Sequence, residues 1–341
     1  MSFPDERRGL RRRDLLCGGA ATLLLGSCAP RRKSADRPRV SIIKAASYSG
    51  ELAGTIRRAL REHGVQVSGK RVLLKPNLVE FDPGAAINTH PAVVYAALEA
   101  FRSLGAAQVR IAEGPGHRRN TWELAEAAGY FEAVPGFESQ FTDLNLDDVR
   151  RISLPHANST LREIYAPQTA LEADLIVSMP KMKTHHWVGA TLSMKNFFGL
   201  VPGGVYGWPK NVLHWAGIPE CIADLHAAFP KHFAIVDGIV GMEGNGPIQG
   251  TPKTAGVLVV GSDMVAVDAT CCRIMGIDPA GVRYLRLAER RDQTAAPGVQ
   301  QIGEPIAAVV TPFRLLPQFR ALRLSGDLSA KEKVDDPRSR S

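Results

Sequence analysis

Apolar and polar residues alternate along most of the chain in a pattern that predicts strands and helices in turn. Short apolar runs indicate buried strands at 39–44, 71–75, 108–112, 175–179, 233–236 and 256–260. Segments of helical periodicity separate them at 51–63, 91–105 and 121–128, and another runs from a cap at Ser262 to Gly276. This order predicts an α/β fold: a largely parallel sheet with helices on both faces.

Two stretches have no clear period. Residues 130–170 contain scattered Pro, Asn and Asp, which predicts an inserted irregular region, and residues 199–217 are rich in Gly and Trp. Both are candidates for a lid. We expect a single α/β domain, of one or two lobes, over 39–324, and a flexible charged tail at 325–341.

The first residues predict export. The run RRDLL at 12–16 precedes a Gly- and Ala-rich apolar segment, as in a twin-arginine signal peptide, here covering residues 1–27. The run LGSC at 25–28 resembles a bacterial lipobox, in which Cys28 is acylated; the alternative is plain cleavage that leaves a free thiol. Residues 28–38 are expected to form a polar tether. We therefore expect a periplasmic or extracytoplasmic protein, lipid-anchored to the inner or outer membrane.

Charge and cysteine content exclude two classes of function. The formal net charge of +8 falls to +6 without residues 1–27, and the excess is diffuse, so we expect no nucleic-acid partner. Apart from Cys28, the predicted mature chain has Cys221, Cys271 and Cys272, and no Cys-x-x-Cys motif occurs. We therefore expect no intrinsic iron–sulfur cluster.

Polar motifs follow four of the predicted strands. They are KPN at 75–77, EGPG at 113–116, PKMKTH at 180–185, and DG at 237–238 with EGNGP close behind at 243–247. Because the carboxyl ends of parallel strands open at one edge of a sheet, we expect these groups to converge on one cleft.

The densest cluster of charge follows the predicted strand at 175–179, which Pro180 is expected to end in a loop. Lys181, Lys183, His185 and Lys195 are the candidate catalytic residues, with lysine as base or anion clamp and His185 as proton shuttle. A lysine crowded by like charges has its ammonium form disfavoured, which brings it toward the useful acid–base range. The alternative is a solvated basic loop.

Other residues near the predicted strand ends are candidates for binding an anion or a metal. The candidate anion-binding residues are Lys75, Asn77, His90, Asn196, Gly244 and Gly246. A divalent metal is the candidate cofactor, and its candidate ligands are Asp237, Glu243 and Asp268. The alternative for Asp268 is a cap, or a partner for a buried cation.

Taken together, these motifs resemble those of the uncharacterised family called domain of unknown function 362. The similarity covers most of residues 75–279 and rests on KPN, THP at 89–91, PKMKTH, KN at 195–196, DG, EGNGP and VAVD at 265–268. Many members carry ferredoxin-type cysteine motifs, which this chain lacks. The family is distantly similar to the lactate-racemase type, in which Lys and His serve a nickel cofactor. The resemblance implies the fold and the place of the site, and no reaction.

Three functions fit these observations. The first is an exported enzyme that uses the Lys/His-rich cleft on a small anionic substrate, with a divalent metal as candidate cofactor. The second is a lipoprotein that binds an anion or a metal complex without chemistry. The third is an accessory protein to an iron–sulfur redox partner. The other expected partners are the membrane, through Cys28, and the twin-arginine export machinery.

Overall fold

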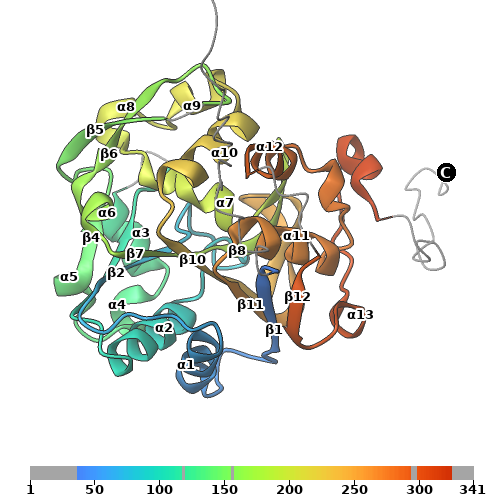
Figure 1. Cartoon of the computed structure of the whole chain (residues 1–341), viewed down its shortest axis with the longest axis horizontal. Helices are drawn as coiled ribbons and strands as arrows, with labels where there is room; N and C mark the ends of the chain where they lie inside the picture. The colour runs from blue at the N-terminus through green and yellow to red at the C-terminus, as the bar shows by residue number, and fades with distance from the viewer. Residues whose placement is uncertain (1–36, 117–119, 155–156, 293–297, 325–341) are drawn as a thin grey trace, which may run out of the picture. The chain divides into compact units, whose positions relative to one another are not determined.

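Ten strands form one sheet within the residues that the computed structural model describes, which are 37–116, 120–154, 157–292 and 298–324 (Figure 1). In chain order they are β1 (Arg39–Lys44), β2 (Arg71–Pro76), β3 (Gln108–Glu113), β4 (Phe141–Asp143), β7 (Leu175–Met179), β8 (Lys181–His185), β9 (Gly189–Thr191), β10 (His232–Asn245), β11 (Gln249–Gly261) and β12 (Gln300–Gly303). The expected signal peptide, Cys28, nearly all of the tether and the tail lie outside the described residues.

The spatial order of the sheet is β12-β1-β11-β10-β7-β2-β3-β4, with β8 and β9 attached beside β10. Pairing is parallel from β10 through β7, β2 and β3 to β4, and also between β1 and β12 and between β10 and β8. Antiparallel pairs join β1 to β11, β10 to β11, and β8 to β9. The predicted α/β fold with a largely parallel sheet is confirmed.

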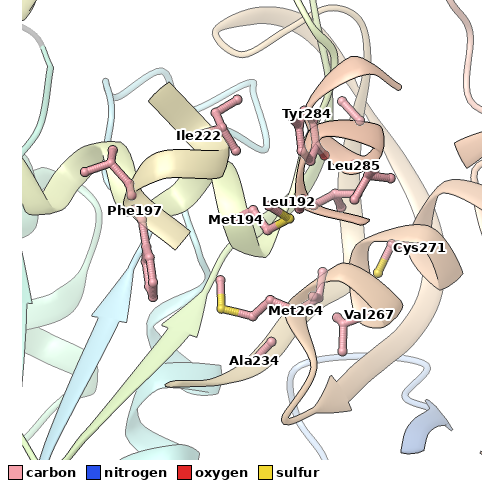
Figure 2. Packing of buried hydrophobic residues seen from close by; sticks show 14 of the residues in the cluster. Leu192, Met194, Phe197, Ile222, Ala234, Met264, Val267, Cys271, Tyr284 and Leu285 are labelled. Atoms are coloured by element: carbon pink, nitrogen blue, oxygen red, sulfur yellow. The ribbon is translucent and has the colours of Figure 1, made fainter. Parts of the chain in front are cut away.

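Helices cover both faces of the sheet (Figure 1). One apolar cluster joins the sheet to α1 (Leu52–Glu62), α2 (Pro91–Ser103) and α3 (Thr121–Ala127). A second joins it to α10 (Ile218–Ala228), α11 (Met264–Ile274) and α12 (Arg283–Asp292), as Figure 2 shows in part. Along β2, Val72 and Leu74 enter the first cluster and Leu73 the second, because successive strand residues point to opposite faces. This explains why the strands are apolar at consecutive positions.

Two helix starts test the cap predictions. The sequence left Thr89 or His90 as the cap of α2. The cap is His90, since its Nδ1 accepts a 3.2 Å hydrogen bond from the backbone N–H of Ala92, with Pro91 in the first turn. The cap of α11 is Asp263 and not the predicted Ser262. The Asp263 carboxylate accepts a 2.9 Å hydrogen bond from the N–H of Ala266, which places the cap one residue later.

The prediction that the chain turns into a loop after Pro180 is wrong. Pro180 has no N–H to donate, but its carbonyl accepts a 2.9 Å hydrogen bond from the N–H of Asp237, so the chain stays extended and continues as β8. Likewise, 237–238 and 243–247 do not follow a strand. They lie within and just beyond β10, which is 14 residues long and forms a hairpin with β11.

The two irregular stretches contain short elements. The first holds α4 (Tyr130–Ala133), α5 (Phe137–Gln140), the β5–β6 hairpin (Val149–Ser153 and Glu163–Pro167) and α6 (Gln168–Glu172). Around the second lie α7 (Ser193–Asn196), η1 (Phe197–Leu200), α8 (Gly203–Tyr206) and α9 (Asn211–Trp215). A 2.8 Å hydrogen bond from the N–H of Tyr165 to the hydroxyl of Tyr206 joins the two stretches. The remaining elements are η2 (Pro279–Gly281), α13 (Ile306–Val309) and η3 (Pro317–Leu322).

Within the described ranges, no helix combines the length and the apolar character needed to cross a membrane.

Candidate functional site

A cavity of about 530 Å³ lies beside the ends of β2, β3 and β8. Its described wall includes four lysines and three histidines, which are Lys75, Lys183, Lys195, Lys210, His185, His186 and His214, together with Glu80 and Glu113. Most of the predicted catalytic and anion-binding residues meet here: Lys75, Asn77, Lys183, His185, Lys195 and Asn196. Lys181, His90, Gly244, Gly246 and the three predicted metal ligands are not part of this wall.

An ion pair forms one side of the cavity. Lys75 at the end of β2 and Glu113 at the end of β3 are both buried, and Lys75 Nζ lies 2.7 Å from Glu113 Oε2. Lys75 Nζ also donates to Asn196 Oδ1 at 3.2 Å, and Asn196 Nδ2 donates to the carbonyl of Lys75 at 3.0 Å. Gly199 makes this arrangement feasible, because a Cβ there would lie 1.9 Å from Glu113 Oε1.

Lys183 is a second, differently bound cation of the wall. Its side chain is fully buried, and Nζ donates to the carbonyls of Ile87 at 2.8 Å and Pro247 at 3.3 Å. No carboxylate contacts it in the described part of the chain. Burial first, and then repulsion from Lys181 and Lys195, lower the pKa of Lys183 well below its usual value.

Lys195, on α7, has the least engaged amine of the wall. It is half-buried, and Nζ lies 3.8 Å from the centre of the Phe198 ring. No hydrogen bond or ion pair holds Nζ among the residues that the structure describes. Burial, followed by repulsion from Lys75, lowers the pKa of Lys195 to about 7. The uncharged amine is therefore more accessible near neutral pH than it is in an ordinary lysine.

Lys210 is a wall residue that sequence reasoning missed. It is buried, and its Nζ donates to the carbonyls of Gly114 at 2.6 Å and Phe198 at 3.3 Å. Burial is the main cause that lowers the pKa of Lys210 to about 7. Its φ of 64° is left-handed, which is uncommon for a residue other than glycine. In the sequence it is a lone lysine inside the unperiodic Gly- and Trp-rich stretch, so no spacing linked it to the other lysines.

The adjacent histidines have opposite hydrogen-bonding roles. The N–H of Trp187 donates to His185 Nδ1 at 3.0 Å, so the ring proton of neutral His185 lies on Nε2. His186 Nδ1 lies 2.7 Å from the carbonyl of Gly246, which can only accept, so Nδ1 carries the proton. Burial, with repulsion from Lys195, lowers the pKa of His185 well below its usual value. The pair therefore offers one N–H donor and one nitrogen lone pair.

Lys181 belongs to a separate buried network behind the cavity. Its Nζ lies 2.5 Å from Asp237 Oδ2 and donates to the hydroxyl of Tyr48 at 3.0 Å. Asp237 also accepts from the hydroxyl of Tyr48 at 3.1 Å and from the N–H of His90 at 3.0 Å. The rings of Tyr48 and His90 stack with their centres 3.7 Å apart. These groups fix the start of α2 to β8 and β10.

The carboxylates predicted to bind a metal do not come together. Asp237 is occupied by Lys181, and Glu243 Oε2 accepts from the N–H of Arg314 at 2.9 Å. Asp268 accepts from the N–H of Ser193 at 2.8 Å and of Met194 at 3.1 Å. In the described ranges no group of three or more His, Cys, Asp or Glu could hold a metal ion. These three residues therefore do not fit a shared divalent metal, and Asp268 instead caps α7.

Gly244 and Gly246 are needed for backbone geometry at the end of β10. Gly244 has a φ of +81°, and a Cβ on Gly246 would lie 2.1 Å from the carbonyl oxygen of Thr184 on β8. The Gly246 carbonyl also accepts a 2.9 Å hydrogen bond from the N–H of His186. These glycines thus let the hairpin approach β8 and orient His186.

Comparison with known proteins places the chain among its relatives. The family described as Domain of unknown function (DUF362) matches residues 72–273. The thylakoid-associated protein sll1697 of Synechocystis sp. is 29% identical over 291 residues, which cover 81% of this chain and 87% of that protein.

Two solved structures are similar in part. The lactate racemase apoprotein of Thermoanaerobacterium thermosaccharolyticum has a TM-score of 0.44 and 15% identity, over 70% of this chain and 57% of that one. A protein from Thermotoga maritima has a TM-score of 0.33 and 13% identity, over 72% of this chain and 59% of that one. The chain thus spans less than two thirds of either protein.

Proposed function

This chain belongs to the DUF362 family, and we propose that it is an enzyme that binds a small anionic substrate in the cavity and acts on it with the amine of Lys195. The observation that carries the proposal is the excess of lysine over carboxylate in the wall, where four lysines line the cavity with Glu80 and Glu113. Lys183, Lys195 and Lys210 contact no carboxylate in the described structure, and all three line the same cavity.

Uncompensated buried cations favour an anionic ligand. Burying an ammonium group without a counter-charge is costly. A carboxylate or phosphate that enters the cavity would supply the missing counter-charge and accept hydrogen bonds from these lysines. The cavity volume of about 530 Å³ is within the range of small-molecule sites. Two further wall atoms, Asn77 Oδ1 and Thr191 Oγ1, are buried and have no hydrogen-bond partner among the described residues. They suit a ligand that also carries hydroxyl groups.

The wall also supplies acid–base chemistry. The uncharged amine of Lys195 is the proton acceptor, since a base that titrates near neutrality is both available and strong enough to act. Neutral His185 donates its Nε2–H to a substrate oxygen that gains negative charge, and it does so as a hydrogen bond and not as an imidazolium. The expected role of His185 as a proton shuttle is thereby narrowed to a donor role.

Anion binding is tested first, by isothermal titration of oxalate, inorganic phosphate and sugar phosphates into the purified domain. We expect saturable binding that weakens at least about tenfold in Lys195→Met and in Lys183→Met, because one charged contact contributes about 1.5–3 kcal/mol. The matched control is Lys70→Met, which removes an exposed lysine outside the cavity. Equal binding by all four proteins would contradict the proposal. Tight binding of a natural anion that is never converted would favour a binding protein over an enzyme.

We also propose that the chain works at a membrane surface on the outer side of the cytoplasmic membrane. The support is the twin-arginine run at 12–16 and the lipobox at 25–28, together with the name of the thylakoid-associated relative. Expression of the full chain followed by membrane fractionation tests this. Cys28→Ser should move the protein into the soluble exported fraction, and mass spectrometry should find lipid on Cys28 of the unaltered chain. Unmodified Cys28 would contradict the anchor.

A further inference from the structure

We propose that Lys195 captures carbonyl compounds: its amine forms an imine with a small aldehyde or ketone that also carries an anionic group. This inference rests on the proposed function, because the anionic group is held by the same cations. It goes further by assigning a covalent step and a substrate class.

The first support is the accessibility of the amine. Lys195 Nζ lies at the cavity wall over the face of Phe198, and no hydrogen bond occupies it in the described part of the chain. By contrast, Lys75, Lys183 and Lys210 each donate to one or more protein oxygens within 3.0 Å. If one of these amines loses a proton, its remaining N–H bonds are still held by those oxygens. Lys195 is therefore the wall amine that is free to reach a ligand carbon.

The second support is the rigidity of the helix that carries this amine. Asp268 binds the first two N–H groups of α7, and Asn196 donates to the carbonyl of Lys75 and to the hydroxyl of Ser178. The neighbouring residues Leu192, Met194 and Phe197 are buried in the apolar core, as Figure 2 shows. A fixed backbone leaves the Lys195 side chain as the moving part, which is suitable for a nucleophile that must be aligned with a carbonyl.

The third support is the neighbourhood, which favours the uncharged amine. Fully buried Lys75 lies close enough to repel a proton on Lys195, and an adjacent cation in a desolvated site is a recognised way to activate a lysine nucleophile. Lys183 and Lys210, whose amines are already held by backbone carbonyls, remain to bind the anionic group of the substrate. The carbonyl group of the ligand would thus meet Lys195, and its anionic group would meet Lys183 and Lys210.

The covalent step is balanced without an oxidant or reductant. The lone pair of Nζ attacks the carbonyl carbon, and the π electron pair moves to oxygen. Transfer of one proton from the positively charged nitrogen to this oxygen gives a neutral carbinolamine. Loss of that hydroxyl as water, with loss of the remaining N–H proton, leaves a C=N bond between Lys195 and the substrate. The Nε2–H of His185 can stabilise the developing oxyanion.

Reductive trapping with glyoxylate tests the inference. Glyoxylate has an aldehyde and a carboxylate, and cyanoborohydride reduces its imine to a carboxymethyl-lysine that peptide mass spectrometry locates. At neutral pH we expect Lys195 to be modified at least about tenfold faster than Lys70, because an ordinary lysine is almost fully protonated there. Inorganic phosphate should slow the trapping at Lys195 and leave that at Lys70 unchanged.

Two outcomes would overturn the inference, and they are distinguishable. If glyoxylate and phosphate bind but trapping is spread over exposed lysines and misses Lys195, the anion site stands and the covalent step is wrong. If neither anion binds and Lys195 is not trapped, the proposed function fails with it. Lys70→Arg, which lies outside the cavity, should keep anion binding and the modification of Lys195. Lys195→Arg should lose that modification. Peptide mapping of the unaltered protein gives the answer even if that variant does not fold.

Discussion

Asp268 accepts a 2.8 Å hydrogen bond from the backbone N–H of Ser193, the residue that begins α7. Two residues later, the same helix carries Lys195 into the cavity wall. Asp268 is thus a positioning residue. It lies on α11, behind the site, and it acts through the backbone of α7.

Asp268→Asn should lower the free energy of unfolding by about 1–3 kcal/mol. The reason is that the amide nitrogen cannot accept a hydrogen bond, so one of the buried N–H groups of Ser193 and Met194 would lose its acceptor. Urea unfolding measures the loss. The control is Asp263→Asn at the cap of the same helix α11, where asparagine caps as well as aspartate, so the change should be small. Anion binding by Asp268→Asn should also weaken, which a purely remote structural defect would not cause.

Glu113→Gln should cost about 3–5 kcal/mol of stability, since it leaves the buried Lys75 ammonium without its counter-charge. The exposed pair Glu99–Arg102 provides the comparison, and Glu99→Gln should cost less than about 1 kcal/mol. Adding Lys75→Met to Glu113→Gln should recover part of the loss in the same urea titration. A cost for Glu113→Gln as small as that for Glu99→Gln would contradict the buried ion pair.

Stability should rise with pH above neutrality. The pKa values of Lys195 and Lys210 are lowered from 10.5 to about 7, so between those values the unfolded chain binds more protons than the folded one. The free energy of unfolding therefore increases with pH across this window. Burial raises the pKa of Asp268 from 3.8 to about 7, and this group acts oppositely, lowering stability as pH rises from 4 to 7. Lys195→Met should show a smaller rise between about pH 7 and pH 9 than the unaltered chain or Lys70→Met.

His185 should stay neutral with its proton on Nε2 between about pH 6 and pH 8. The reason is the combination of burial with the N–H of Trp187, which directs a hydrogen bond at Nδ1. Long-range ¹⁵N correlation spectra of the imidazole rings distinguish this tautomer, and loss of the signals in His185→Gln assigns them. A resonance that shifts to the imidazolium position within this range would contradict the donor role proposed for His185.

Several strands could be predicted because local apolar patterns determine them. The apolar run at 175–179 has too few residues for a helix and forms β7, and Pro91 marks the first turn of α2. The sequence narrowed the cap of α2 to Thr89 or His90. The cavity needed tertiary information. Lys181 and Lys183 are two residues apart, yet one binds Asp237 and the other lines the cavity, because their partners come from β10 and from the segment around Ile87. The position of Lys210 could not be predicted, because its partners are the backbone carbonyls of Gly114 and Phe198. Every residue has such a carbonyl, so the sequence does not mark these two.

Strand β8 determines both polar centres at once. Its odd-numbered positions place Lys181 on Asp237, Lys183 on the Ile87 carbonyl and His185 in the cavity, while Met182 packs in the apolar core. If β8 shifted by one residue against β10, each side chain would take the position of its neighbour. A lysine would then lie in the apolar core, and Met182 would lie beside Asp237. Registers shifted by one residue are therefore strongly disfavoured, and both centres depend on the same register of β8. A chain that has misassembled at β8 should consequently lose both the Lys181–Asp237 ion pair and the cavity wall around Lys183 and His185.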